Sequence, residues 1–133
     1  MAHEWVLIER LSDPIDFTVA DGVGIEKGTL MQLTDPRTAS AVSASGQIIA
    51  GVLAREKIAS DGRTRSPLFQ SGIFRVFSSG ATVLGEGFQS GLPLNDVTGF
   101  AGGKGRRLGG TALETIANNT EGHVHLNLGG AAT

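Results

Sequence analysis

The chain has 133 residues, no cysteine and a formal net charge of −2 at pH 7. The lack of cysteine excludes disulfide bonds, thiolate nucleophiles and cysteine-ligated metal sites. The small negative charge argues against a nucleic-acid partner, because proteins that neutralise phosphates carry a clear basic excess. Aromatic residues make up only 5% of a chain that contains 20 glycines. We therefore expect one domain with a thin core, many turns and stabilisation by burial of surface between subunits.

The N-terminal third of the chain is acidic, and the remainder is correspondingly basic. This asymmetry allows complementary patches between subunits, although solvated surface charge is the ordinary explanation. The first five residues lack the basic-then-apolar order of a signal peptide, and no run approaches the roughly 20 apolar residues that span a bilayer. We expect a protein made in the cytoplasm, with no membrane partner.

Apolar residues recur at a spacing of two, which places alternate side chains on opposite faces of a strand. Turn residues separate the apolar runs at Asp21-Gly22, Asp35-Pro36, Ser45-Gly46, Asp61-Gly62, Gly91-Leu-Pro93 and Glu121-Gly122. The predicted strands cover residues 5–9, 16–20, 29–34, 39–43, 48–54, 69–78, 81–84, 97–100, 111–116 and 122–128. Many short strands between turns predict an all-β fold, a small antiparallel β-barrel or sandwich. No sequence repeat of fixed period is visible.

Two stretches call for more detailed predictions. In residues 69–78, Ile73 and Phe77 alternate with Phe74 and Val76, so both faces are apolar and a central strand is expected. We assign Phe74 and Phe77 to the core. Residues 53–59 have a helix-forming composition but are too few for a stable helix, so a strand that runs into a loop is preferred over a short helix.

The segment from residue 99 to residue 110 is dense in glycine and basic. Backbone amides together with Lys104, Arg106 and Arg107 suggest an anion cradle. A P-loop, however, requires Ser or Thr after the lysine and then a helix, whereas Gly105 follows Lys104. We predict a mobile surface loop whose arginines bind carboxylates of a neighbouring subunit.

In residues 122–128, Val124 and Leu126 share one face with Leu128, and His123 and His125 lie on the other. Two imidazoles on one side of a strand are the geometry of cupin-like metal sites, but no carboxylate follows them, and the chain holds one further histidine near its start. We predict no metal and assign both histidines to a solvent-exposed or interface surface whose charge responds to pH.

Catalytic patterns are also lacking in the sequence. It contains no Gly-x-Ser-x-Gly elbow, and no acid–base pair stands out by its spacing. The carboxylates Glu114 and Glu121 flank a predicted hairpin turn, where charge usually protects an edge. We expect no enzymatic activity and no cofactor.

Several blocks, taken in order, resemble the capsid decoration (cement) proteins of tailed bacteriophages, formerly a family of unknown function. They are Asp21-Gly-Val-Gly-Ile-Glu-Lys-Gly-Thr-Leu30, Leu33-Thr-Asp-Pro-Arg37, Ile49-Ala-Gly-Val52, Ala54-Arg-Glu-Lys57, Asp61-Gly-Arg-Thr-Arg65, Gly72-Ile-Phe74, Gly109-Gly-Thr-Ala-Leu-Glu114 and Glu121-Gly-His-Val-His-Leu-Asn-Leu128. Each block alone is a generic turn-and-strand sequence, so the order and spacing carry the resemblance.

The resemblance implies a β-tulip-like module that binds the outer capsid surface of the virion as a homotrimer and joins neighbouring capsomers, with the major capsid protein as partner. The first 14 residues are longer than the family pattern and carry Trp5. We therefore expect an extended N-terminal arm over residues 1–15 and a single β domain over residues 16–133.

A decoration protein needs broad contact with a few aromatic anchors inside a polar rim. The predicted capsid or subunit interface comprises Trp5, Phe100, Lys104, Arg106, Arg107, His123 and His125. For Trp5 and Phe100 a place in the core is the alternative. Two other functions stay open: a carbohydrate- or host-binding module on the virion surface, and a small metal-dependent β-barrel enzyme.

Overall fold

The computed structural model describes residues 3–43, 47–82, 84–85, 87–91, 94–99 and 110–127. This part of the chain is all β, which confirms the predicted fold class. It contains no helix, and therefore no helix that could cross a membrane. Its strands are β1 (Val6–Arg10), β2 (Ile15–Thr18), β3 (Leu30–Asp35), β4 (Thr38–Ala41), β5 (Ile49–Leu53), β6 (Arg65–Phe69), β7 (Ser71–Ser78), β8 (Gly87–Ser90), β9 (Val97–Gly99), β10 (Gly110–Ala112) and β11 (Thr120–Asn127).

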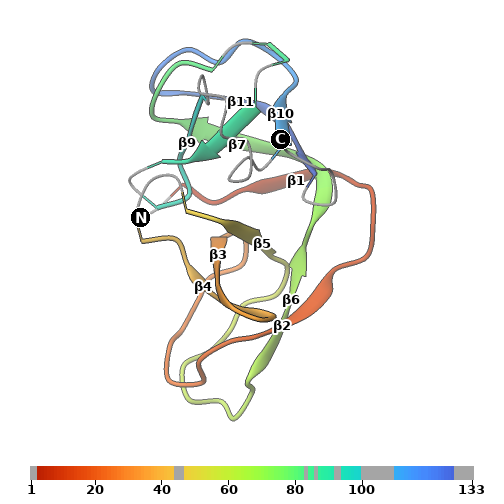
Figure 1. Cartoon of the computed structure of the whole chain (residues 1–133), viewed down its shortest axis with the longest axis vertical. Coiled ribbons are helices and arrows are strands. Elements are labelled where there is room, and N and C mark those ends of the chain that lie inside the picture. Colours follow the sequence, from red (N-terminus) through yellow and green to blue (C-terminus); the bar gives the residue numbers. More distant parts are fainter. Residues whose placement is uncertain are drawn as a thin grey trace.

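The strands form two closed barrels that follow one another along the chain (Figure 1). The first barrel has the strand order β2-β4-β3-β5-β6. The second has the order β7-β11-β10-β8-β9 and closes through a parallel pair, Ser78 with Val97. Strand β1 is antiparallel to β7 and lies outside this ring. The single domain expected over residues 16–133 is therefore a pair of barrels.

The two barrels repeat one topology. Each begins with a strand that pairs parallel to the third strand and antiparallel to the fifth, and the remaining pairs also match. Outside the strands, the isolated bridge between Ile25 and Lys57 corresponds to the bridge between Thr82 and Ile116. The repeat was not predicted, because the two halves share backbone hydrogen bonds rather than a recognisable residue pattern.

One pair of glycines marks the repeat in the backbone. Gly51 in β5 and Gly110 in β10 have φ angles of 150° and 149°. A Cβ atom at Gly51 would lie 2.5 Å from the carbonyl oxygen of Phe69, and one at Gly110 would lie 1.8 Å from that of His125. Each barrel therefore needs a residue without a side chain where its fourth strand crosses its fifth.

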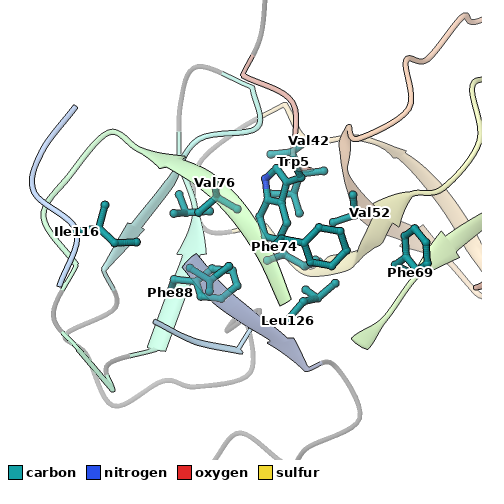
Figure 2. Close-up of a cluster of buried hydrophobic side chains, with 13 residues drawn as sticks. Trp5, Val42, Val52, Phe69, Phe74, Val76, Phe88, Ile116 and Leu126 are labelled. Carbon is teal, nitrogen blue, oxygen red and sulfur yellow. The ribbon is translucent and has the colours of Figure 1, made fainter. Parts of the chain in front are cut away.

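Two apolar clusters stabilise the pair of barrels. The first fills the first barrel and consists of Phe17, Val19, Ile25, Met31, Ala39, Ala50, Leu53 and Leu68. The second combines the interior of the second barrel with residues from the first, among them Leu30, Val42, Val52 and Phe69 (Figure 2). Because one cluster spans both barrels, they pack as one unit rather than as beads on a linker.

The structure corrects several local predictions. Strands β6 and β8 were not predicted, and the turn placed at Glu121-Gly122 lies inside β11, while the chain turns at residues 118–119. β7 is a central strand as predicted, with Phe74 in the core. Phe77 is on the opposite, half-exposed face, so its assignment to the core was wrong. β5 ends at Leu53 and runs into a loop, as preferred over a helix.

The described residues of the segment predicted as an N-terminal arm pair with the rest of the chain. β1 pairs with β7 from Val6 opposite Arg75 to Arg10 opposite Gly72, with a bulge between Leu7 and Glu9. β2 begins at Ile15 and belongs to the first barrel. The segment is held by its own chain, because β1 pairs with β7 and Trp5 is buried at the junction of the barrels.

Candidate functional site

Trp5 lies at the junction of the barrels and is 3% exposed. Its backbone N–H donates to the Gly28 carbonyl in the first barrel at 2.9 Å, and its indole Nε1–H donates to the Asn95 carbonyl in the second, also at 2.9 Å. The indole packs against Phe74 and Phe88 with centroid distances of 5.5 and 5.8 Å (Figure 2). Trp5 is a core residue of this chain, which is the alternative that the sequence left open.

Asn95 completes this junction from the second barrel. It has a φ angle of 75° and is 3% exposed. Its side-chain Oδ1 accepts a 2.7 Å hydrogen bond from the backbone N–H of Leu30, the first residue of β3. One residue thus bonds both the N-terminal segment and the first barrel, which fixes the position of the barrels relative to each other.

His3 forms a second attachment of the N-terminal segment. Its ring stacks on Phe77 with centroids 3.9 Å apart and an interplanar angle of 14°. Its Nδ1 lies 2.9 Å from Oδ1 of Asp96, whose side chain is 1% exposed while that of His3 is 46% exposed. The imidazole therefore covers a half-exposed aromatic ring and pairs with a buried carboxylate.

The histidines of β11 lie on the outer face of the second barrel, opposite the buried Val124 and Leu126, as predicted. His123 Nδ1 lies 3.3 Å from Oε2 of Glu114, and the same carboxylate oxygen accepts the backbone N–H of His123 at 3.0 Å. His125 pairs across the sheet with Ile73 and with Thr111. On this outer face His123 is exposed and His125 is half-buried.

The part of the chain that the structure describes builds no metal centre around these histidines. Within the described ranges, no group of three or more His, Cys, Asp or Glu side chains is arranged to hold an ion. His123 meets one carboxylate, and both cross-strand neighbours of His125 lack a metal ligand. A catalytic zinc site needs three protein ligands.

The other predicted interface residues are Phe100, Lys104, Arg106 and Arg107. They lie outside the residues that the structure describes. Their proposed contact with a neighbouring subunit stays a prediction from the sequence.

The first barrel contains a buried ion cluster that sequence reasoning missed. The Lys57 side chain is fully buried, and its Nζ donates to Asp61 Oδ1 at 2.7 Å and to Asp21 Oδ1 at 2.9 Å. It also donates to the carbonyls of Ile58 at 2.6 Å and Asp21 at 3.0 Å. One ammonium group thereby joins the loop after β2 to the loop after β5, and these loops form one end of the first barrel.

The ion cluster shifts the pKa values of Lys57 and Asp61. Burial alone would lower the pKa of Lys57, but the hydrogen bonds to Asp61 and Asp21 outweigh it and raise this pKa above 10.5. The hydrogen bond from Lys57, together with the backbone N–H of Arg63, lowers the pKa of Asp61 to about 2. Lys57 and Asp61 are therefore both charged across the neutral range.

No sequence signal pointed to this cluster. Lys57 follows Arg55 and Glu56 in a charged stretch that ordinarily lies in solvent, and Asp21 is 36 residues away from it. Glycine and aspartate at residues 21–22 and 61–62 correctly predicted chain reversals. The sequence pattern does not show how close these two chain reversals lie in space, because that distance depends on barrel closure.

Comparison with known proteins yields a likeness of fold. No protein-family model matches the chain, and no curated protein matches its sequence. A solved structure, described as the head fiber gp8.5 N base in bacteriophage phi29, superimposes with a TM-score of 0.57 at 12% sequence identity. The match covers 86% of this chain and 94% of the phage chain. Membership of the decoration family suggested by the sequence therefore stays a prediction.

Proposed function

We propose that this chain is a structural protein of a bacteriophage head that binds the outer surface of the capsid. The observation that carries the proposal is the fold: nearly the whole chain superimposes on nearly the whole base of a phage head fiber. A protein bound to the outside of a head must be a compact unit that resists deformation, and we propose that this chain serves as such a unit. The ordered resemblance of the sequence to capsid decoration proteins points to the same class of particle.

The build of the molecule suits a surface-bound plug. Closed barrels abolish free strand edges, and here two barrels share one apolar cluster. Trp5 and Asn95 further fix the barrels to each other through hydrogen bonds. A unit of this kind loses little conformational entropy when it binds, so broad contact converts more fully into affinity.

The finer role that we propose is cementing. A homotrimer would engage the major capsid protein of neighbouring capsomers at three equivalent points, and the effective concentration of the second and third contacts would strengthen attachment. On the outer face, His123 and His125 would contribute polar contacts of the rim. Phe100, Lys104, Arg106 and Arg107 are the proposed anchors from the glycine-rich segment.

The decisive experiment uses heads of the encoding phage that lack this protein. The purified full-length chain, added to expanded heads, is expected to co-sediment with them in a saturable, stoichiometric ratio and to raise the temperature at which they release DNA. Precursor heads are the control and are expected to bind less. If expanded heads bind none of the chain at any concentration, the proposed function is wrong.

A paired substitution locates the contact. R106A/R107A is expected to weaken head binding and to reduce its dependence on salt, because charge pairs across an interface are screened by ions. R55A/R65A removes the same charge from exposed positions of the first barrel and serves as the control. Equal loss in both variants would mean that general charge, rather than the glycine-rich segment, attracts the chain to the shell.

A further inference from the structure

Two loops at one end of the first barrel, residues 19–29 after β2 and residues 54–64 after β5, are tied together by several hydrogen bonds. The backbones of Ile25 and Lys57 exchange two hydrogen bonds of 2.8 Å, and the N–H of Ser60 donates to the carbonyl of Asp21 at 2.6 Å. The N–H of Gly62 donates to Asp21 Oδ1 at 2.9 Å. Beneath the loops, the buried Lys57 ammonium donates to four oxygens. We call this end of the first barrel the clamped end.

The barrel fold does not require the charged part of this clamp. At the matching position the second barrel has Ile116, which is buried in the shared apolar cluster. A buried ion cluster is seldom more stabilising than a well-packed apolar group of similar size. What the cluster provides is one fixed shape for two surface loops, and a loop fixed in its bound shape loses less entropy when it meets a partner.

The clamped end carries apolar side chains on its surface. Val23 is 53% exposed and Ile58 is 61% exposed. Ile58 directly follows Lys57, and Val23 lies two residues before Ile25, so the bridge between Ile25 and Lys57 brings both side chains to the same end of the barrel. Scattered exposed apolar residues are ordinary, but rigidly held ones can fill a pocket in a partner.

Exposure by itself does not single out this end of the molecule. At the matching end of the second barrel, Leu84 and Leu113 are 63% and 43% exposed. The described residues there join the two loops by hydrogen bonds, such as that from the Leu84 N–H to Thr115 Oγ1 at 3.2 Å, and by no ion pair. The clamp therefore distinguishes the first barrel from the second as a site for a rigid contact.

The clamped end lies apart from the surfaces that the sequence assigns to partners. In Figure 1 its loops form the bottom of the molecule, and the second barrel occupies the upper part. His123 and His125 belong to β11 of the second barrel, and the glycine-rich segment connects its strands β9 and β10. A protein that joins neighbouring capsomers needs two contacts that are separated in space, and this end is placed to make the second one.

We propose that the clamped end is a second docking surface for the capsid, at which Val23 and Ile58 enter an apolar depression in the major capsid protein of a neighbouring capsomer. The inference rests on the proposed function, since the second barrel makes the first contact with the head. The new contact is apolar, because the ammonium group of Lys57 is fully buried between Asp21 and Asp61 and does not reach the surface.

Expanded heads that lack this protein test the second contact with the full-length chain. V23S/I58S removes apolar surface from the clamped end and is expected to weaken head binding at least about tenfold. L84S/L113S, the control, removes two exposed leucines from the matching end of the second barrel and is expected to bind like the unmodified chain. All four residues are exposed, so both variants should fold, which circular dichroism verifies.

A second readout separates bridging from simple attachment. At saturating protein, V23S/I58S is expected to reach full stoichiometry on the heads, yet the heads should release DNA at nearly the temperature of bare heads. The reason is that each chain then holds one capsomer without its neighbour. Full heat stabilisation by V23S/I58S, or an equal loss in V23S/I58S and L84S/L113S, would overturn the second contact and leave the proposed function standing. If the unmodified chain binds no heads, both proposals are wrong.

Discussion

The two barrels share a topology but close one end with different chemistry. In the first barrel the bridge residue is Lys57, which is held by Asp21 and Asp61. In the second barrel the corresponding residue is Ile116, which is 1% exposed and belongs to the shared apolar cluster. The same backbone position therefore accepts an ammonium group or a branched hydrocarbon, provided that the residues around it change as well.

The surrounding residues do change together. The backbone N–H of Ser60 bonds to the carbonyl of Asp21 at 2.6 Å, and the matching bond in the second barrel runs from Asn119 to Ser78 at 2.8 Å. Ser78 and Thr120 thus stand where the first barrel has Asp21 and Asp61. Beside Ile116, Gly122 provides room, because a Cβ atom there would lie 2.4 Å from Ile116 Cγ1.

We infer that the ion cluster fixes geometry more than it adds stability. Replacing a buried ion pair by apolar residues is often neutral or stabilising, while removing one partner is costly. The second barrel realises the apolar alternative within the same chain. We infer that the first barrel uses Lys57 because its four oxygen acceptors hold two loops in one arrangement.

The largest expected effect comes from placing the charged residue of the first barrel at the matching apolar position of the second barrel. Ile116→Lys buries an ammonium group among hydroxyls instead of carboxylates, so the free energy of unfolding should fall by about 4 kcal/mol or more. Urea denaturation measures this loss. Ile116→Val, the control, should cost about 1 kcal/mol. A similar small loss in both variants would contradict the claim that a lysine at this position needs the carboxylates of the first barrel.

A second prediction tests whether the barrels unfold together. Trp5→Ala removes the indole from the junction and should lower the free energy of unfolding by about 3–5 kcal/mol. Trp5→Phe keeps part of the apolar contact but loses the hydrogen bond to Asn95, so its loss should be smaller. Calorimetry distinguishes a single destabilised transition, expected for one unit, from two separate transitions, which would show that the barrels are independent.

A third prediction concerns the removal of Lys57. Lys57→Met leaves Asp21 and Asp61 without their cation, and the thermal midpoint should fall by several degrees. The triple variant K57I/D21S/D61T copies the second barrel and should recover much of the loss. A triple variant no more stable than K57M would show that the first barrel cannot accept the apolar solution.

The smallest effect is a dependence of stability on pH. Because Lys57 lowers the pKa of Asp61 from 3.8 to about 2, its stabilising contribution is complete above pH 4 and is lost as the pH falls towards 2. The raised pKa of Lys57 makes its own contribution complete below pH 10.5 and lost only at higher pH. Between pH 4 and pH 2 the thermal midpoint should therefore fall more for the unmodified chain than for K57I/D21S/D61T. An equal fall in both proteins would contradict a stabilising contribution from the Lys57–Asp61 pair.

Much of the fold was predictable, because it is written in local patterns. Alternation correctly placed β7 and β11, including the faces of Phe74, Val124 and His123. β6 and β8 were missed because Pro67 interrupts one strand and glycine and glutamine dilute the other. Phe77 was assigned to the core because both faces of its strand carry apolar residues. Its ring lies on the outer face, where the ring of His3 stacks on it.

The candidate site was less predictable than the fold. The exposed histidines of β11 follow from a period of two, which a single strand contains. Trp5 looked like an anchor for a partner because it stands near the start of the chain, yet its partners Gly28 and Asn95 come from different barrels. Residues so far apart in sequence meet only when both barrels have closed.

By itself the sequence determined the class of structure, since spacing of apolar residues and turn chemistry act over a few residues at a time. Only the tertiary structure decided that the chain forms two barrels of one topology, that Lys57 is buried and that β1 pairs with β7 outside the second barrel. Those outcomes depend on which strands become neighbours. Barrel closure brings together groups such as Asp21 and Lys57, and long-range pairing of this kind leaves no periodic trace along the chain.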